Sequence, residues 1–217
     1  MKNYKKPKYW EKACKELSLK DPILEKIIKK NYKIVLFSRN DPFTTLVRSI
    51  IGQQVSVTVA DKAWNNLKRK IKIKKNNDLE IVSPSDILLS QIKLSSIGLS
   101  KKKCNYIIEL ASIFSSNPSY CQNFSNLSDS EIIRILVQHK GIGPWTAKMF
   151  LLFYLMRPNV FPESDIGLIK SISKIYKLDQ NFCIKKQVEK LSKNWEPWKT
   201  VATWYLWCEI DPSPIVY

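Results

Sequence analysis

Apolar residues recur at helical spacing along almost the whole chain, and no stretch shows the strict alternation of a half-buried β-strand. Between residues 56 and 71, for example, Val59, Ala63 and Leu67 lie four residues apart on one helical face. The pattern predicts an all-α protein of ten or so short helices, with polar loops at 72–77 and 115–126. The expected helices cover residues 7–17, 22–30, 43–51, 56–71, 84–92, 100–114, 127–138, 148–156, 166–176, 182–191 and 197–209.

Several of these helices carry recognisable start signals. Asp21 and Asp41 each precede a proline, which combines an N-cap side chain with a residue suited to the first helical turn. Ser100 is expected to cap the next long helix, and Ser128-x-x-Glu131 has the spacing of a capping box. The helix expected at 148–156 is apolar all round, so it should be buried.

A short glycine-containing connection joins the helices expected at 127–138 and 148–156. Its residues 139–147 read His-Lys-Gly-Ile-Gly-Pro-Trp-Thr-Ala, and only about five residues form the turn itself. Gly141 and Gly143 permit positive φ and leave backbone N–H groups uncovered, while Pro144 suits a first helical turn. Exposed amides at the start of a helix dipole bind anions, and a DNA phosphate is the natural candidate. A plain turn between two packed helices is the alternative interpretation of the same spacing.

The net charge and the cysteines limit the classes of protein that fit this sequence. The 217 residues carry a formal net charge of +17, which favours a polyanionic partner. The abundance of Lys, Asn and Ile also fits codon bias in an AT-rich genome. Five scattered cysteines without a C-x-x-C pair indicate reduced thiols, and with a single histidine they predict neither a metal site nor a cofactor. No apolar run reaches 18 residues, so we expect a soluble cytoplasmic protein that does not contact membranes.

Asp165 is the candidate catalytic residue. It precedes the helix expected at 166–176, where the positive end of the dipole and backbone N–H groups favour an ionised carboxylate. From its position alone a simple N-cap role remains open, and Glu163 is the neighbouring alternative for an acidic role.

Four motifs resemble one known superfamily. They are Asp-Pro-Phe-x-x-Leu-Val-Arg-Ser-Ile-Ile-Gly-Gln-Gln-Val-Ser at 41–56, Gly-Ile-Gly-Pro-Trp-Thr-Ala at 141–147, Phe-Pro-x-x-Asp-x-Gly-Leu at 161–168, and Trp-x-Pro-Trp-Lys-x-x-Ala-x-Trp-Tyr-Leu-Trp at 195–207. In this order they resemble the helix-hairpin-helix DNA glycosylases, and within them the 3-methyladenine DNA glycosylase II (alkyladenine) branch. The motifs lie between residues 41 and 207, and the resemblance extends over about residues 10–210, nearly the whole chain.

The resemblance implies one glycosylase unit over residues 1–217, with a two-lobed all-α fold and an active-site cleft between the lobes. One lobe would comprise about residues 1–40 and 160–217, and the other about 41–159, including the hairpin at 128–157. Some members carry an added N-terminal β-domain, whereas this chain resembles the compact form without it.

The resemblance also implies a reaction. An alkylated purine in double-stranded DNA would be flipped out and its N-glycosidic bond hydrolysed, which leaves an abasic site. Asp165 would stabilise the positive charge that develops on the sugar and would orient the attacking water. Trp145 stands where lyase-type branches carry a nucleophilic lysine, and Lys148 lies three residues further on, so we expect a monofunctional enzyme.

Binding roles follow from the same motifs. Lys140, Gly141, Gly143 and Thr146 would hold the DNA backbone, and the residues leave open whether a monovalent cation binds the hairpin carbonyls. Among the aromatic side chains, Trp145 and Trp207 are expected to contact the base, whereas those expected to pack in the interior are Trp64, Trp195 and Trp198.

Gln53 and Gln54 occupy the position of the wedge that fills the space left by the flipped base, although the branch often has an apolar residue at 54. A surface helix terminus is the alternative for both glutamines. We expect a structural role for Arg48 and no catalytic role for His139.

Two alternatives to alkylated purines remain. One is a helix-hairpin-helix glycosylase for another lesion, such as uracil or a mismatched or deaminated base. The other is a non-catalytic DNA-binding module, which would have no use for a carboxylate at position 165. In either case we expect a monomer that binds nucleoid DNA.

Overall fold

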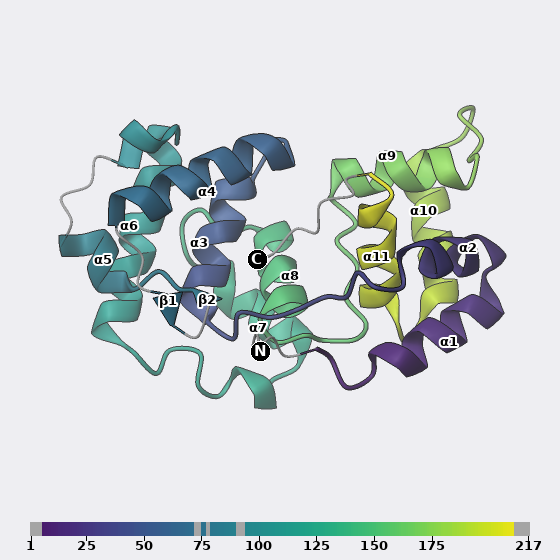
Figure 1. The fold of residues 1–217 in the computed structure, drawn as a ribbon, viewed down its shortest axis with the longest axis horizontal. Coiled ribbons are helices and arrows are strands. Elements are labelled where there is room, and N and C mark those ends of the chain that lie inside the picture. Colours follow the sequence, from purple (N-terminus) through teal and green to yellow (C-terminus); the bar gives the residue numbers. More distant parts are fainter. Residues whose placement is uncertain (1–5, 72–74, 77–78, 90–93, 211–217) are drawn as a thin grey trace. The chain divides into compact units, whose positions relative to one another are not determined.

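The computed structural model describes residues 6–71, 75–76, 79–89 and 94–210, and these are predominantly helical (Figure 1). The all-α prediction is confirmed. The elements are α1 (Trp10–Lys20), α2 (Pro22–Asn31), α3 (Pro42–Gly52), α4 (Val57–Ile71), β1 (Lys75–Asn76), β2 (Leu79–Glu80), α5 (Pro84–Leu89), the 3₁₀ turn η1 (Leu94–Ile97), α6 (Lys101–Ser116), η2 (Phe124–Asn126), α7 (Asp129–Leu136), α8 (Pro144–Phe153), α9 (Ile166–Ile175), α10 (Ile184–Ser192), η3 (Lys193–Trp195) and α11 (Lys199–Cys208).

The described chain divides into two compact units. One comprises residues 38–155, and the other comprises residues 6–37 and 156–210. We call them the hairpin unit and the terminal unit, and each is described by itself.

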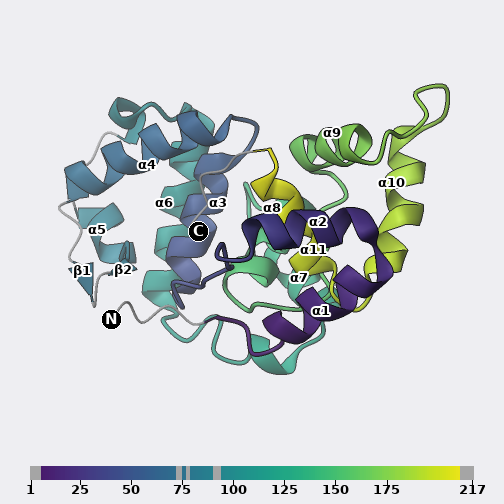
Figure 2. The same cartoon turned by 45° about the vertical axis from the view of Figure 1, so that its right-hand side comes forward.

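Helix α3 is the central element of the hairpin unit. Every residue from Phe43 to Ile51 is buried, and the helix packs against α4, α6 and α8. Figures 1 and 2 show α8 beside α3 in both views. Helix α8 is also largely buried, as its all-round apolar sequence predicts. The two helices therefore form a core, and the glycine turn at 137–143 leads directly into one of them, α8.

Aromatic rings extend this core towards the turn. Phe124 lies between Tyr120 and Phe150, at ring-centroid distances of 5.5 and 5.9 Å with the rings edge to face. Tyr120 in turn contacts the ring of His139, 5.4 Å away. Edge-to-face pairs add about 0.5–1.5 kcal/mol each to the burial of their area, so the start of the turn is tied to the core by packing.

Arg48 has the structural role that the sequence suggested. Its side chain is 4% exposed and donates to the Ala60 carbonyl at 3.0 Å, and it forms an ion pair with Asp61. Its guanidinium lies 5.6 Å from the centroid of the Trp64 ring, and that of Arg39 lies 5.4 Å from the same ring. Trp64 is 3% exposed, so it belongs to the core, as expected.

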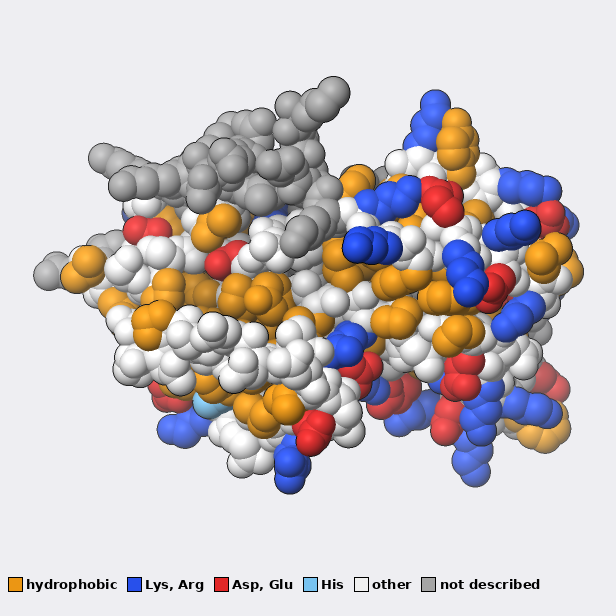
Figure 3. All heavy atoms as spheres, turned by 90° about the horizontal axis from the view of Figure 1, so that it is seen from below, with side chains coloured by type: hydrophobic (Ala, Val, Ile, Leu, Met, Phe, Trp, Pro, Cys, Tyr) orange, Lys and Arg blue, Asp and Glu red, His pale blue; other side chains and the backbone are white. Residues whose placement is uncertain are grey.

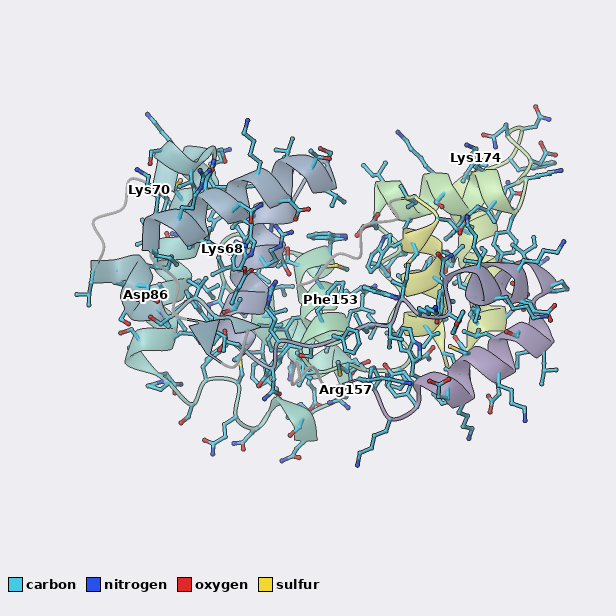
Figure 4. All side chains as sticks on the ribbon, in the orientation of Figure 1. Lys68, Lys70, Asp86, Phe153, Arg157 and Lys174 are labelled. Carbon is cyan, nitrogen blue, oxygen red and sulfur yellow. The ribbon has the colours of Figure 1, made fainter. Side chains whose placement is uncertain are left out.

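Glu80 joins this cluster of charges from β2. Its carboxylate accepts hydrogen bonds from the indole of Trp64 at 3.3 Å and from Lys68 at 2.7 Å, and Figure 4 labels Lys68 on α4. Burial alone would raise the pKa of the Glu80 carboxyl, but the hydrogen bond and charge of Lys68 bring it below its ordinary value. Strand β2 is thereby attached to α4.

Helix α11 is the buried element of the terminal unit. All its residues from Thr200 to Cys208 are buried, and it packs against α1, α2 and α9. Trp195 and Trp198, which were expected to pack in the interior, are 0% and 9% exposed. Trp195 is the last residue of η3, and Trp198 is the N-cap residue of α11.

A buried carboxylate organises the same unit. Asp21 is 8% exposed and caps α2 by accepting from the backbone N–H groups of Ile23 and Leu24. Its other oxygen accepts from the hydroxyl of Tyr176 at 2.7 Å and from the indole of Trp195 at 3.1 Å. One side chain thus satisfies donors from three separate segments of the chain.

The bounds of the hairpin helices differ from the prediction. Helix α8 begins at Pro144 rather than Lys148, and it ends at Phe153 rather than Met156. Met156 has φ +52°, which is incompatible with a right-handed helix. The first hairpin helix ends at Leu136 rather than Gln138, so seven residues connect the helices instead of about five.

Two further segments depart from the expected pattern. The polar loop at 72–77 contains β1, which pairs antiparallel with β2, and its other residues lie outside the described part. The helix expected at 84–92 is α5, which ends at Leu89, and residues 90–92 also lie outside the described part.

Candidate functional site

The turn between α7 and α8 depends on glycine at position 141. Gly141 has φ +84°, and a Cβ built there would lie 2.3 Å from Cγ of Tyr106 on α6. The preceding residues follow a regular series of turns, in which His139 N–H donates to the Leu136 carbonyl and Ile142 N–H to the His139 carbonyl. Because a side chain at 141 would meet both an unfavourable φ and an aromatic ring, only glycine fits without displacement.

Gly143 differs from Gly141 in its backbone conformation and in the space around it. It is the N-cap of α8, with an ordinary φ of −93°, and a Cβ there would have no atom within 4 Å. Its carbonyl accepts the first bond of the helix, from Ala147 N–H at 3.0 Å, and Pro144 fills the first helical position. The open space beside Gly143 lies at the positive end of the α8 dipole, which favours an anion.

The side chains that flank the turn face different surroundings. Lys140 is 77% exposed, and its ammonium lies 3.6 Å from the carboxylate of Glu109 on α6. Thr146 is 1% exposed, so its side chain is interior, whereas Trp145 is partly exposed. Lys140 and Trp145 therefore have side chains that reach the surface.

The two neighbouring glutamines after α3 diverge. Gln53 is partly buried, and its amide Nε2 donates to the Gly141 carbonyl at 2.7 Å and to the Thr146 hydroxyl at 2.8 Å. Gln54 is exposed and has φ +55°, in the left-handed region. The sequence treated both as wedge candidates, but the structure brings Gln53 into contact with the hairpin.

His139 is a partly buried neighbour of the turn. Its Nε2 lies 2.5 Å from the hydroxyl of Tyr120, and burial lowers the pKa of the imidazole below its ordinary value. Burial also raises the pKa of Tyr120 to about 12, so at neutral pH a neutral phenol is hydrogen-bonded to a neutral imidazole. This pair explains the position of His139 by packing and hydrogen bonding.

Asp165 lies in the terminal unit as the N-cap of α9. Its Oδ1 accepts from Leu168 N–H at 2.8 Å, and its own N–H donates to the Pro162 carbonyl at 2.9 Å. The side chain is partly exposed, and the Cβ of an alanine at position 167 would lie 3.3 Å from Oδ1. Glu163, the other acidic residue of this loop, is also partly exposed.

The loop that carries Asp165 is held by Thr200 of α11. The Thr200 hydroxyl accepts from Val160 N–H at 3.1 Å and donates to the Arg157 carbonyl at 2.5 Å, while its N–H donates to the Pro158 carbonyl at 3.1 Å. Figure 4 labels Arg157 at the start of this loop. Buried Val160 and Phe161 add packing, so the backbone that leads to Asp165 is well fixed.

Trp207, the second aromatic residue expected to contact a base, lies on α11 and is 9% exposed. The candidate residues thus fall into two groups. Those of the hairpin unit are Gln53, Gln54, Lys140, Gly141, Gly143, Trp145 and Thr146, and those of the terminal unit are Asp165 and Trp207.

Neither the surface charge nor possible metal ligands extend the two groups of candidate residues. On the right-hand part of the face in Figure 3, lysine and arginine side chains are interleaved with acidic ones. In the described residues no three His, Cys, Asp or Glu side chains are grouped as metal ligands. None of the described helices is long and apolar enough to cross a membrane.

Three contacts around the turn had no signal in the sequence. They involve α6 residues that lie far from the hairpin along the chain: Lys103, Tyr106 and Glu109. Only their spacing of three residues on a helical pattern could have indicated a shared face, and nothing local indicates what that face contacts.

A fold of packed helices with a glycine turn between α7 and α8 defines a helix-hairpin-helix protein. The chain belongs to the HhH-GPD superfamily of base excision DNA repair proteins, whose model matches residues 47–197. It is similar to a DNA-3-methyladenine glycosylase of Bacillus subtilis, with 27% identity over 201 residues that cover 88% of this chain and 65% of that protein. An alkylbase DNA glycosidase-like protein of Schizosaccharomyces pombe is 28% identical over 91% of this chain and 92% of its own length.

Solved structures agree with this assignment. The structure of a 3-methyladenine DNA glycosylase of Schizosaccharomyces pombe in complex with abasic DNA matches with a TM-score of 0.76 and 26% identity, over 95% of this chain and 100% of that one. The chain spans somewhat less than two thirds of the first Bacillus relative and 59% of a second, putative DNA-3-methyladenine glycosylase from the same organism.

Proposed function

We propose that this protein is a monofunctional DNA glycosylase that removes N-alkylated purines from double-stranded DNA, as a monomer and without a cofactor. The observation that carries the proposal is Asp165, a partly exposed carboxylate at the N-terminus of α9. The names of the similar proteins, DNA-3-methyladenine glycosylases among them, support the substrate class. The protein would be located in the compartment that holds the DNA of the cell.

The reaction is a hydrolysis. The bond between C1′ of the deoxyribose and the purine nitrogen breaks, and its electron pair leaves with the base. An alkylated purine is cationic, so it departs as a neutral base without needing a general acid. The sugar becomes positively charged, and an ionised Asp165 stabilises that charge electrostatically. Water then adds to C1′, and Asp165 accepts its proton, which leaves an abasic site.

The aromatic residues supply recognition of the base. A cationic purine is attracted to the face of an electron-rich ring, and stacking is worth about 1–3 kcal/mol per base. Trp145, which is partly exposed, is the leading candidate, and Trp207 offers a smaller surface. Trp145 stands where lyase-type branches carry the nucleophilic lysine and has no amine, so we expect no covalent imine with the sugar.

The hairpin would hold the DNA backbone. Gly143 and the first turn of α8 present an open approach at the positive end of a helix dipole, and Lys140 adds a charged side chain at the surface. Gly141 and the backbone of Thr146 complete this site. Exposed Gln54, at the end of α3, is the candidate wedge.

The test is release of free base from methylated duplex DNA. We expect Asp165→Asn to reduce release by about 100-fold or more, the scale of a lost acid–base group. Asparagine is as good an N-cap as aspartate, so the fold should be retained. Asp41→Asn is the matched control, since Asp41 caps α3 in the same way and lies in the other unit.

Three outcomes would contradict the proposal. Equal release by wild type and Asp165→Asn would remove this carboxylate from the mechanism. Duplex binding without base release by either protein would favour a non-catalytic DNA-binding module. A borohydride-trapped enzyme–DNA adduct would overturn the monofunctional assignment.

A further inference from the structure

The end of α3 places two glutamines in opposite environments. Gln53 is the C-cap residue, with φ −58° and ψ 127°, and its N–H donates to the Ile50 carbonyl at 3.3 Å. The backbone then turns into the left-handed region at Gln54, which is exposed. As a result the first side chain points towards the hairpin, while the second is free to meet a partner.

Both hydrogen bonds of the Gln53 amide group go to the hairpin. Nε2 reaches the Gly141 carbonyl at 2.7 Å and the Thr146 hydroxyl at 2.8 Å, two acceptors on opposite sides of Gly143. An amide group has two N–H donors, which matches this pair of acceptors. The side chain therefore joins the turn to the first turn of α8 across the open backbone at Gly143.

Helix α6 holds the other end of this connection. The Lys103 ammonium donates to the Ile51 carbonyl at 2.8 Å and to the Gln53 carbonyl at 2.7 Å. Burial lowers the pKa of this ammonium, and the two carbonyls compensate part of its lost hydration. Lys103 thereby satisfies carbonyls at the C-terminus of α3 and fixes the backbone of Gln53.

The same face of α6 contacts the hairpin directly. Tyr106 and Glu109 follow Lys103 at intervals of three residues, so all three lie on one helical face. The ring of Tyr106 lies against Gly141, and Glu109 forms the ion pair with Lys140. This face and Gln53 together fix the hairpin turn and the segment at 53–54 to one another.

We propose that Gln53 is a positioning residue, which sets the geometry of the hairpin amides for a DNA phosphate and does not enter the DNA itself. The proposal rests on the proposed function, because it presumes that the hairpin binds DNA. It divides the roles of the two glutamines: Gln53 orients the hairpin, and Gln54 remains available as the wedge.

The test compares Gln53→Met with Gln138→Met. Methionine has a similar length but cannot donate. Gln138 is exposed, lies in the connection just after α7, and its side chain donates to the Arg134 carbonyl at 3.2 Å. Hydrogen exchange of the amides at 139–147 is measured in the free protein, and affinity for an undamaged duplex is measured over a range of salt concentrations. We expect Gln53→Met to raise exchange about tenfold or more, the factor that corresponds to one lost net hydrogen bond of about 1.4 kcal/mol.

Affinity should fall by a similar factor for Gln53→Met, with an unchanged salt slope because no charge is removed. Lys140→Gln should instead reduce the slope by about one. Thr146→Val, which removes one of the two acceptors, should give a smaller change in exchange in the same direction, and it tests the contact even if Gln53→Met fails to fold. Gln138→Met should change neither quantity.

Unchanged exchange in both Gln53→Met and Thr146→Val would overturn the inference even if wild type released base normally. Faster exchange with unchanged affinity would also overturn it, because the contact would then serve the fold alone. If wild type bound no duplex, the proposed function would be wrong. The exchange data would still show whether the hydrogen bonds of Gln53 hold the hairpin turn.

Discussion

Replacing Gly141 with alanine tests whether backbone sterics fix the hairpin turn. Gly141 has φ +84°, and the new Cβ would lie 2.3 Å from Cγ and 2.4 Å from Cδ2 of Tyr106. These atoms belong to the near end of the ring, next to the Tyr106 Cβ at 2.7 Å, so a small rotation of the side chain cannot clear them. Either the ring or the turn must move.

The cost follows from three terms. A non-glycine residue in the left-handed region costs about 1–2 kcal/mol, and overpacking adds about 1–3 kcal/mol. The lower entropy of alanine in the unfolded chain offsets about 0.4–1 kcal/mol. We therefore expect Gly141→Ala to lower the free energy of unfolding of the hairpin unit by about 1–5 kcal/mol, with a central value of about 3 kcal/mol.

Urea unfolding followed by circular dichroism measures this loss. Gly143→Ala is the matched control, since its φ is −93° and its Cβ would meet no atom within 4 Å. It should stay within about 0.5 kcal/mol of wild type, as surface substitutions do. In Gly141→Ala combined with Tyr106→Ala the overpacking term should disappear and the backbone term should remain. If Gly141→Ala were as stable as Gly143→Ala, the steric reasoning would be refuted.

Two further predictions concern the packing around each unit. Because burial lowers the pKa of His139, the imidazole should titrate below 6.5; the stability it contributes as a neutral ring is present above that pH and is lost as the pH falls through the folded-state pKa. NMR of the ring of this one histidine measures the midpoint directly, and a value at or above 6.5 would contradict the account. Asp21→Ala should lower the free energy of unfolding by about 2–4 kcal/mol, because it removes an N-cap and leaves the buried indole of Trp195 without its acceptor. Urea unfolding checks this, and a loss below about 0.5 kcal/mol would show that other groups satisfy these donors.

Helix starts could be predicted well because their chemistry is local. Asp21, Asp41, Ser100, Ser128 and Asp165 all cap the helices that the sequence assigned to them, and the capping box at Ser128 is complete. In each case the capping side chain and the N–H it accepts from lie two or three residues apart. Such short-range bonds are visible in one sequence without knowledge of the fold.

Helix ends at the hairpin were harder to predict. The apolar run from Met149 suggested a start at Lys148, but α8 begins four residues earlier, where Pro144 supplies the φ of a first turn. The same run suggested an end at Met156, yet the helix ends at Phe153, which Figure 4 labels near the end of α8. Hydrophobicity continues beyond the helix because Leu155 and Met156 are themselves partly buried.

The arrangement around Gln53 could not be predicted at all. Its two acceptors lie 88 and 93 residues further along the chain. Two consecutive glutamines give no sign of which side chain bonds to the hairpin and which is available to enter the DNA. The sequence therefore assigned one role to both side chains. The separation arises from the backbone, which ends α3 at Gly52 and enters the left-handed region at Gln54.

In the proposed function, the net charge and the hairpin contribute to different parts of DNA binding. The charge of +17 raises the rate of encounter and the salt-dependent affinity for any polyanion. The hairpin turn, in contrast, is shaped by neutral groups: Gly141, Gly143, Gln53 and Thr146 carry no charge, and Lys140 lies beside the opposite charge of Glu109. If the turn binds a phosphate as proposed, that binding should depend on the geometry of the amides more than on local excess charge. Substitutions that distort this geometry should weaken binding at every salt concentration by the same factor, whereas substitutions of lysines should weaken it mostly at low salt.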